Sequence, residues 1–376
     1  MKKFLRACLC AVALAAVIFT LFSAAKKIYN SVEFEAGNYT DYYYLTLDST
    51  EKQAYTAVRQ QIYDFPQKIL TPVLNQAQLE KVLNALICDD PMMFMFNTCT
   101  LKQLGNIAYF IPDYTMSDSE YDNYADKIDT TISRIKETIP EGDDFETELF
   151  WHDYIINRCQ YSDTQSRDES TVVGALLTGK AKCSGYAKAF KLLLNKSGIE
   201  SVLITGDATD FDGNTQSHMW NAVKIDDSWC YTDTTWDDPL SENGEELCMH
   251  NYFNMTEEML SRTHSEFNFS AECDDPYIYY YIRYGAYFTS CDSEDHTNIY
   301  RLIADRALEG EESAEMMFAD KATVQLAVKC LLDNENIYRI LEKAKLSSGL
   351  PIVTDTVKYT VDENENLLTI FFDTEE

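Results

Sequence analysis

The chain has 376 residues and a formal net charge of −31 at pH 7, because 62 Asp and Glu residues outnumber 31 Lys and Arg residues. Its length allows two or three compact domains with ordinary hydrophobic cores. The negative charge repels phosphate backbones, which excludes nucleic acid as a partner, and otherwise indicates only a well-hydrated surface.

The first 27 residues have the pattern of a membrane-targeting segment. Three basic residues precede an uncharged, mostly apolar stretch at positions 7–25, whose length is close to the roughly 20 residues of a membrane-spanning helix. The positive charges predict a cytoplasmic N-terminus and place the remaining chain outside. We therefore expect residues 1–27 to be a membrane anchor, which the length of the apolar stretch favours, or a signal peptide cleaved near Ala25. Residues 28–44, which are polar and rich in tyrosine, would form a spacer.

Helical patterns dominate residues 45–140. Thr50 and Gln53 have the spacing of a capping box and predict the start of a first helix, and Pro91 ends a second. The third helix is the most regular and ends before Pro140. Its apolar residues recur every three or four positions: Tyr121, Tyr124, Ile128, Ile132, Ile135 and Ile139. We expect a helix-rich N-terminal unit over this range.

A fourth helix, around residues 146–158, precedes the first segment that contains a candidate catalytic residue. After Cys183, apolar residues recur at helical spacing until Gly198, which would end the helix. The free N–H groups and the dipole at a helix start favour the thiolate, the form of cysteine that attacks a carbonyl carbon. The alternative for Cys183 is a small buried packing residue, which is the commoner role of cysteine.

Two strands follow, joined by a short polar turn at Asp226 and Asp227. If these two residues are the centre of the turn, His218 and Asp233 lie diagonally on the same face of the hairpin. Asp233 could then hold one imidazole nitrogen while the other takes the proton of Cys183, which is the arrangement of a catalytic triad. A turn one residue longer would place the two side chains on opposite faces.

Few other histidines could act as the base. Several other aspartates could supply the carboxylate, and the neighbouring tryptophans have more than one possible role. A structural histidine is the alternative for His218, and a turn or cap residue is the alternative for Asp233. Core packing is the default role of Trp220 and Trp236, with substrate binding as the second possibility. The other histidines, none of which has this strand context, are His152, His250, His264 and His296. The rival carboxylates are Asp226, Asp227, Asp237 and Asp238.

Residues 265–376 have a different character and predict a small α/β unit. Helices are expected around residues 298–308 and between about 322 and 345. Residues 357–361 and 367–372 read as two strands separated by a polar turn. We find no set of residues in this part of the sequence whose types and spacing predict a catalytic site.

Three blocks in the middle of the chain resemble the transglutaminase-like superfamily, especially its bacterial extracellular branch. The blocks occupy positions 179–190, 218–221 and 231–239. The resemblance implies a papain-like α+β fold over a catalytic domain at about 141–264. It also implies a Cys-His-Asp triad, with Cys183 as nucleophile, His218 as base and Asp233 as the orienting carboxylate.

The resemblance indicates the catalytic residues more clearly than it indicates the reaction that they catalyse. We expect an exported thiol acyltransferase that acts on protein or peptide carboxamides through a thioester. Wall or surface proteins are candidate substrates only because of the expected location outside the cytoplasm. A cysteine peptidase or amidase, with water as acceptor, is one alternative, and a non-catalytic binding module is another. Tyr161, Trp220 and Trp236 are the candidate substrate-binding residues. No metal or cofactor is expected, since the cysteines form no CxxC pair and show no regular spacing.

Overall fold

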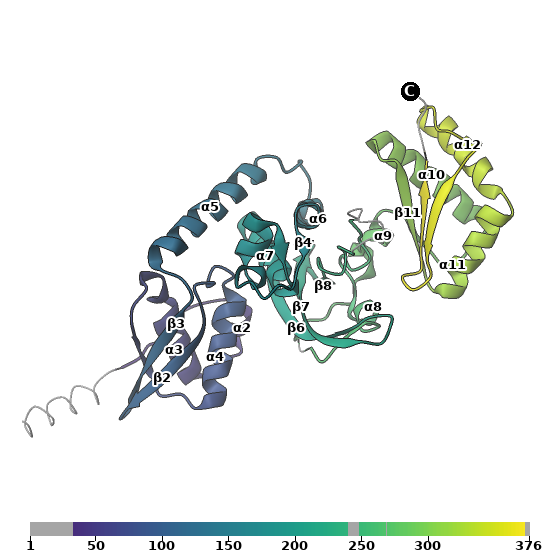
Figure 1. Cartoon of the computed structure of the whole chain (residues 1–376). Helices are drawn as coiled ribbons and strands as arrows, with labels where there is room; N and C mark the ends of the chain where they lie inside the picture. The colour runs from purple at the N-terminus through teal and green to yellow at the C-terminus, as the bar shows by residue number, and fades with distance from the viewer. Residues whose placement is uncertain (1–32, 240–247, 268, 373–376) are drawn as a thin grey trace, which may run out of the picture. The chain divides into compact units, whose positions relative to one another are not determined.

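The computed structural model describes residues 33–239, 248–267 and 269–372 (Figure 1). The expected anchor or signal peptide at residues 1–27 lies outside these ranges. Within them, no helix is both long and apolar enough to cross a membrane. The chain divides into two compact units, each described by itself below. Among the described residues, the first comprises 33–138 with 171–177, and the second comprises 139–170 with those from 178 to 372.

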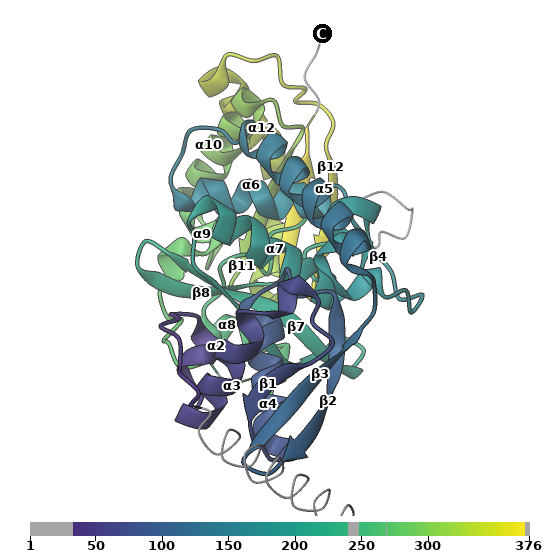
Figure 2. The same ribbon diagram turned by 90° about the vertical axis from the view of Figure 1, so that its left-hand side faces the viewer.

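The first unit packs helices against a three-stranded antiparallel sheet with the strand order β1-β3-β2. Helix α3 lies against both β1 and α4, and Figure 2 shows the long β2–β3 hairpin beside them. The strands are β1 (Ile69–Pro72), β2 (Phe96–Leu104) and β3 (Ile107–Tyr114). The helices are α2 (Tyr42–Leu45), α3 (Ser49–Arg59), α4 (Gln76–Asp89) and α5 (Asp118–Lys136).

The predicted helices of this unit are confirmed, but the predicted start of the first is wrong. The capping box consists of Asp48 and Glu51, and Oδ1 of Asp48 accepts hydrogen bonds from the backbone N–H groups of Thr50 and Glu51. A carboxylate at this position also interacts favourably with the helix dipole, which a hydroxyl at Thr50 does not. The β2–β3 hairpin was not predicted; its two strands meet at Gly105, whose φ of 65° suits a tight turn.

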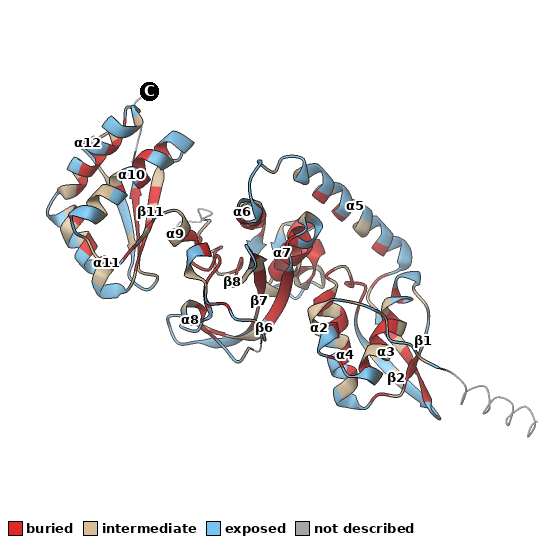
Figure 3. Ribbon diagram, turned by 180° about the vertical axis from the view of Figure 1, so that it is seen from behind, coloured by how far each residue is buried: buried red, intermediate tan, exposed pale blue. Residues whose placement is uncertain are grey.

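The core of the second unit is a four-stranded antiparallel sheet covered by helix α7 (Cys183–Ser197), an α+β, papain-like arrangement. The strand order is β8-β7-β6-β9. Figure 3 shows the buried residues of α7 where it packs on β6 and β7. The strands are β6 (Ser201–Thr209), β7 (Thr215–Ile225), β8 (Ser228–Thr232) and β9 (His264–Ser265). Around them lie α6 (Asp144–Ile156), α8 (Glu257–Leu260), and the short parallel pair β4 (Gln160–Tyr161) and β5 (Lys180–Ala181).

Two local predictions that decide the site are confirmed here. Helix α7 begins at Cys183 and ends at Gly198, whose φ of 91° allows the left-handed cap. The β7–β8 hairpin turns at Asp226 and Asp227 with φ angles of 50° and 66°, as a two-residue turn with both φ angles positive requires. Strand β8 therefore pairs with β7 in the predicted register, with Asn221 opposite Thr232.

The C-terminal part of this unit contains a second sheet, with the order β10-β11-β13-β12. The predicted strand pair is confirmed as β12 (Lys358–Asp362) and β13 (Leu367–Phe371). The helix predicted between about 322 and 345 is two helices, because the chain passes through a π-helical turn and then a left-handed residue, Glu335. The remaining elements are α9 (Tyr280–Arg283), β10 (Tyr287–Phe288), α10 (Ser293–Glu309), β11 (Ser313–Phe318), α11 (Lys321–Val328) and α12 (Asn336–Ser348).

Candidate active site

Cys183 is the first residue of α7 and is half-exposed. The helix is fixed beneath it because the Tyr186 ring is fully buried and its hydroxyl donates to the Cys159 carbonyl oxygen at 2.9 Å. The first turn of the helix carries no acidic residue that would oppose a negative charge on sulfur. Cys183 lines an open groove together with His218 from β7 and Thr205 from β6.

His218 contacts Asp233 and lines the same groove as Cys183. Its Nε2 is 2.6 Å from Oδ2 of Asp233. Burial lowers the pKa of His218, but the charge and hydrogen bond of Asp233, assisted by Cys183, outweigh burial and raise the pKa to about 10. The imidazole is therefore protonated at neutral pH, where a positive charge beside the sulfur stabilises a thiolate.

Asp233 follows directly after β8 and is buried. Its Oδ1 accepts hydrogen bonds from the backbone N–H groups of Thr235 at 2.9 Å and Trp236 at 3.3 Å, which leaves Oδ2 to the imidazoles. Burial alone would raise the pKa of Asp233, but the charges and hydrogen bonds of His218 and His264 hold it well below its usual range. The carboxylate is thus ionised and fixed in orientation.

His264 is the site residue that sequence reasoning did not assign. It is buried in β9, and its Nε2 lies 3.1 Å from Oδ2 of Asp233. Its Nδ1 lies 2.9 Å from Oγ1 of Thr263. Strand β9 has only two residues and joins the sheet through β6, so no periodic pattern in the sequence marks His264.

The three aromatic candidates occupy different surroundings. Trp220 is fully buried and stacks on the His218 ring with centroids 5.9 Å apart. Trp236 is half-buried and lies 6.0 Å from the same ring. Tyr161 is 37% exposed, and burial together with the nearby charge of Cys183 raises its pKa. The groove itself is lined by residues that the sequence pattern did not single out: Ser184, Thr205, Gly206, Asp207, Ser217, Met219 and Glu266.

This arrangement can perform nucleophilic acyl chemistry. A thiol at a helix start shares a groove with an imidazole that a buried carboxylate holds, and these are the groups of a nucleophile, base and orienter triad. Residues 133–234, which contain all three side chains, match the model of the transglutaminase-like superfamily. This segment belongs to the transglutaminase-like superfamily.

Curated relatives of the transglutaminase-like segment include the kyphoscoliosis peptidases of Mus musculus and Homo sapiens. Each is 31% identical over 91 residues, which cover 22% of this chain and 13% of the relative. The matched stretch is therefore a small part of either relative. Among solved structures, the crystal structure of a TGase is similar, with a TM-score of 0.28 and 16% identity, over 45% of this chain and 50% of that chain.

Proposed function

We propose that this chain is an exported thiol acyltransferase that acts on protein or peptide carboxamides. Cys183 is the nucleophile, His218 the general acid and base, and Asp233 the group that orients His218. The observation that carries the proposal is the 2.6 Å contact between His218 and Asp233, with Cys183 and His218 lining the same groove. The transglutaminase-like segment supplies the reaction class.

The first half of the reaction forms a thioester. The Cys183 thiolate attacks the carbonyl carbon of the carboxamide, and the backbone N–H of Cys183 is positioned at a helix start to donate to the developing oxyanion. The C–N bond then breaks while the His218 imidazolium gives its proton to the departing ammonia. The products of this half are free ammonia, an acyl group on sulfur and a neutral imidazole.

The second half releases the acyl group and restores the enzyme. His218 takes a proton from a primary amine, whose nitrogen attacks the thioester carbonyl, and the C–S bond breaks to regenerate the thiolate. The product is an isopeptide-type amide. Water in place of the amine would give hydrolysis, and the kyphoscoliosis peptidases, by name, favour that as the second candidate.

The proposed substrates lie outside the cytoplasm, since basic residues precede the apolar stretch at positions 7–25. Wall and surface proteins are the partners that fit such a location. Protease added to intact spheroplasts should digest the chain beyond residue 28. Full protection, with the membrane shown to be intact, would contradict an exported enzyme.

The acceptor is tested by product mass. Glutamine-containing wall or surface peptides are incubated with the protein, with and without a labelled primary amine, and the Cys183→Ser variant serves as the matched control. Amine incorporation that requires Cys183 is the expected result. Cleavage or deamidation that requires Cys183 but ignores the amine would establish a hydrolase. Failure of every peptide, combined with an unreactive Cys183, would favour a non-catalytic binding module.

A further inference from the structure

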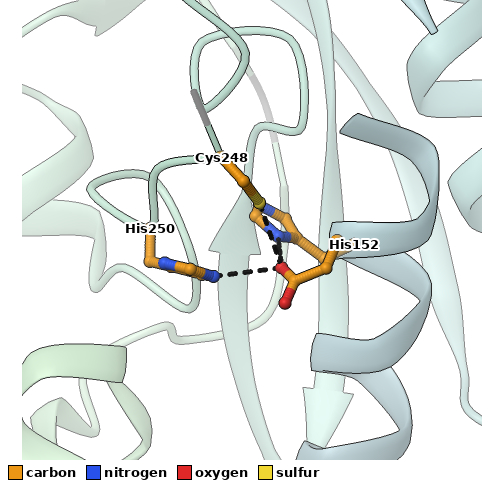
Figure 4. A group of neighbouring side chains, drawn as sticks. His152, Cys248 and His250 are labelled. Atoms are coloured by element: carbon orange, nitrogen blue, oxygen red, sulfur yellow. Dashed lines mark hydrogen bonds and ion pairs between the residues drawn. The ribbon is translucent and has the colours of Figure 1, made fainter. Parts of the chain in front are cut away.

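A second cluster of chemically active side chains lies away from the groove, on helix α6 and the segment at 248–250. His152 and Asp153 are neighbours near the C-terminal end of α6, and Figure 4 shows the imidazoles of His152 and His250 and the sulfur of Cys248 turned toward one another. One donor atom from each of these three residues, with one oxygen of Asp153, lies within 4.8 Å of the others. Two parts of the chain that are far apart in sequence thus deliver four metal-binding groups to one point.

Three of these groups converge on a single carboxylate oxygen. Oδ1 of Asp153 lies 2.8 Å from Nδ1 of His152, 3.0 Å from Nε2 of His250 and 3.4 Å from Sγ of Cys248. The edges of a tetrahedron around a zinc ion are about 3.3–3.8 Å, given Zn–N and Zn–O bonds of about 2.0–2.1 Å and a Zn–S bond of about 2.3 Å. The separation from sulfur matches these edges, the two from nitrogen are shorter, and the remaining pairs lie within 4.8 Å, so side-chain shifts that lengthen the short contacts would admit the ion.

The residues that contact the four candidate ligands also fit a metal site. The outer nitrogen of His152, Nε2, lies 3.1 Å from Oδ2 of Asp237, and both side chains are fully buried. A carboxylate on the far side of an imidazole fixes the ring and raises its basicity as a ligand. The ring of Tyr280 stacks on His250 at 4.0 Å and holds its plane. The side chain of Asp153 is 37% exposed, which leaves an entry path for an ion.

We propose that His152, Asp153, Cys248 and His250 bind one zinc ion as a closed structural site. Two imidazoles with one thiolate suit zinc better than magnesium or calcium, which prefer oxygen ligands. Four protein ligands leave no open position, which is typical of structural rather than catalytic zinc. The thiolate and the carboxylate together balance the charge of the ion.

The zinc ion would stiffen the loop that carries the catalytic carboxylate. Asp237, which holds His152, donates its backbone N–H to the Asp233 carbonyl oxygen at 3.2 Å. Its Oδ1 also accepts the backbone N–H of Tyr252 at 2.9 Å, and the Tyr252 carbonyl oxygen in turn accepts the N–H of Asp233. The ligands of the ion and the position of Asp233 are therefore linked through Asp237.

The test uses the untagged full chain and the metal ion alone. After chelator treatment, zinc is titrated in competition with a chromophoric chelator, and cobalt is then added in place of zinc. The expected results are one zinc ion per chain, visible bands of tetrahedral cobalt and a thiolate-to-cobalt charge-transfer band. A chain that binds neither ion, although folded by circular dichroism, would show a hydrogen-bonded cluster only and would overturn the proposal.

Variants assign the ion to these residues. Cys248→Ser should lose the charge-transfer band, and His250→Gln should weaken zinc binding at least about tenfold, because loss of even an outer-shell partner of a ligand costs about 10- to 100-fold. Cys248→His keeps a ligand and should retain cobalt without the charge-transfer band, which separates ligand loss from misfolding. His296→Gln is the matched control, because His296 belongs to another cluster, with Cys291 and Cys330. Zinc binding that is lost in His296→Gln and kept in His250→Gln would contradict the proposed site.

Discussion

Nε2 of His264 lies 3.1 Å from Oδ2 of Asp233, the same carboxylate oxygen that Nε2 of His218 approaches to 2.6 Å. One oxygen of this buried carboxylate thus contacts two imidazoles, while the other oxygen accepts hydrogen bonds from backbone N–H groups. We infer that His264 is a positioning residue, because it contacts the orienting carboxylate and does not line the groove.

The first prediction concerns His264. His264→Phe removes a hydrogen bond to a charged group, which contributes about 1.5–3 kcal/mol, so turnover should fall roughly 10- to 100-fold with KM unchanged. His264→Gln keeps a donor and should retain most of the turnover. Both are measured with a peptide that passes the amine-incorporation assay. Equal losses in the two variants, in step with their thermal stability, would indicate a structural role only.

The second prediction concerns the carboxylate itself. Asp233→Asn preserves size but no longer supports the imidazolium, so turnover should fall on the order of 10³- to 10⁴-fold. The melting temperature is measured alongside, and its change should be small compared with that loss. Turnover close to that of the unmodified protein in Asp233→Asn would remove Asp233 from the triad.

The third prediction concerns the dependence of stability on pH. The pKa of His218 is about 10 in the folded protein against an ordinary value of 6.5. Between these values the folded protein holds a proton that the unfolded chain has released, so the stabilisation is complete below pH 6.5 and is lost as the pH rises through about 10. The difference in unfolding free energy between the unmodified protein and His218→Gln should therefore shrink over this window. Urea unfolding measures it; a difference that stays constant between pH 6.5 and 10 would show that His218 is neutral in the fold.

The local part of this site could be predicted from the sequence. The shared face of His218 and Asp233 depends on a two-residue turn, and the parity of a hairpin is a short-range property that the residues at 226 and 227 determine. The start of α7 at Cys183 likewise follows from the apolar spacing behind it. The family resemblance rests on the same local blocks, and the matched range of 133–234 contains most of them.

The long-range part could not be predicted. His264 reaches Asp233 only because β9 pairs with β6, a contact set by tertiary packing over two residues. The cluster at Asp153 joins residues 95 and 97 positions apart, so it leaves no spacing motif such as CxxC. The β2–β3 hairpin of the first unit was missed because its outer strand is largely exposed and lacks a continuous apolar face.

The central claim is that Cys183 is an activated nucleophile, and iodoacetamide labelling at about pH 6 tests it most directly, because an ordinary thiol of pKa about 8.5 is almost wholly protonated there. Cys99 is the internal control: it is half-exposed like Cys183, and burial raises its pKa to about 11. We predict rapid alkylation of Cys183, at least about tenfold faster than Cys99, that is lost in His218→Ala. Equally slow labelling of both cysteines, unchanged by His218→Ala, would contradict the account.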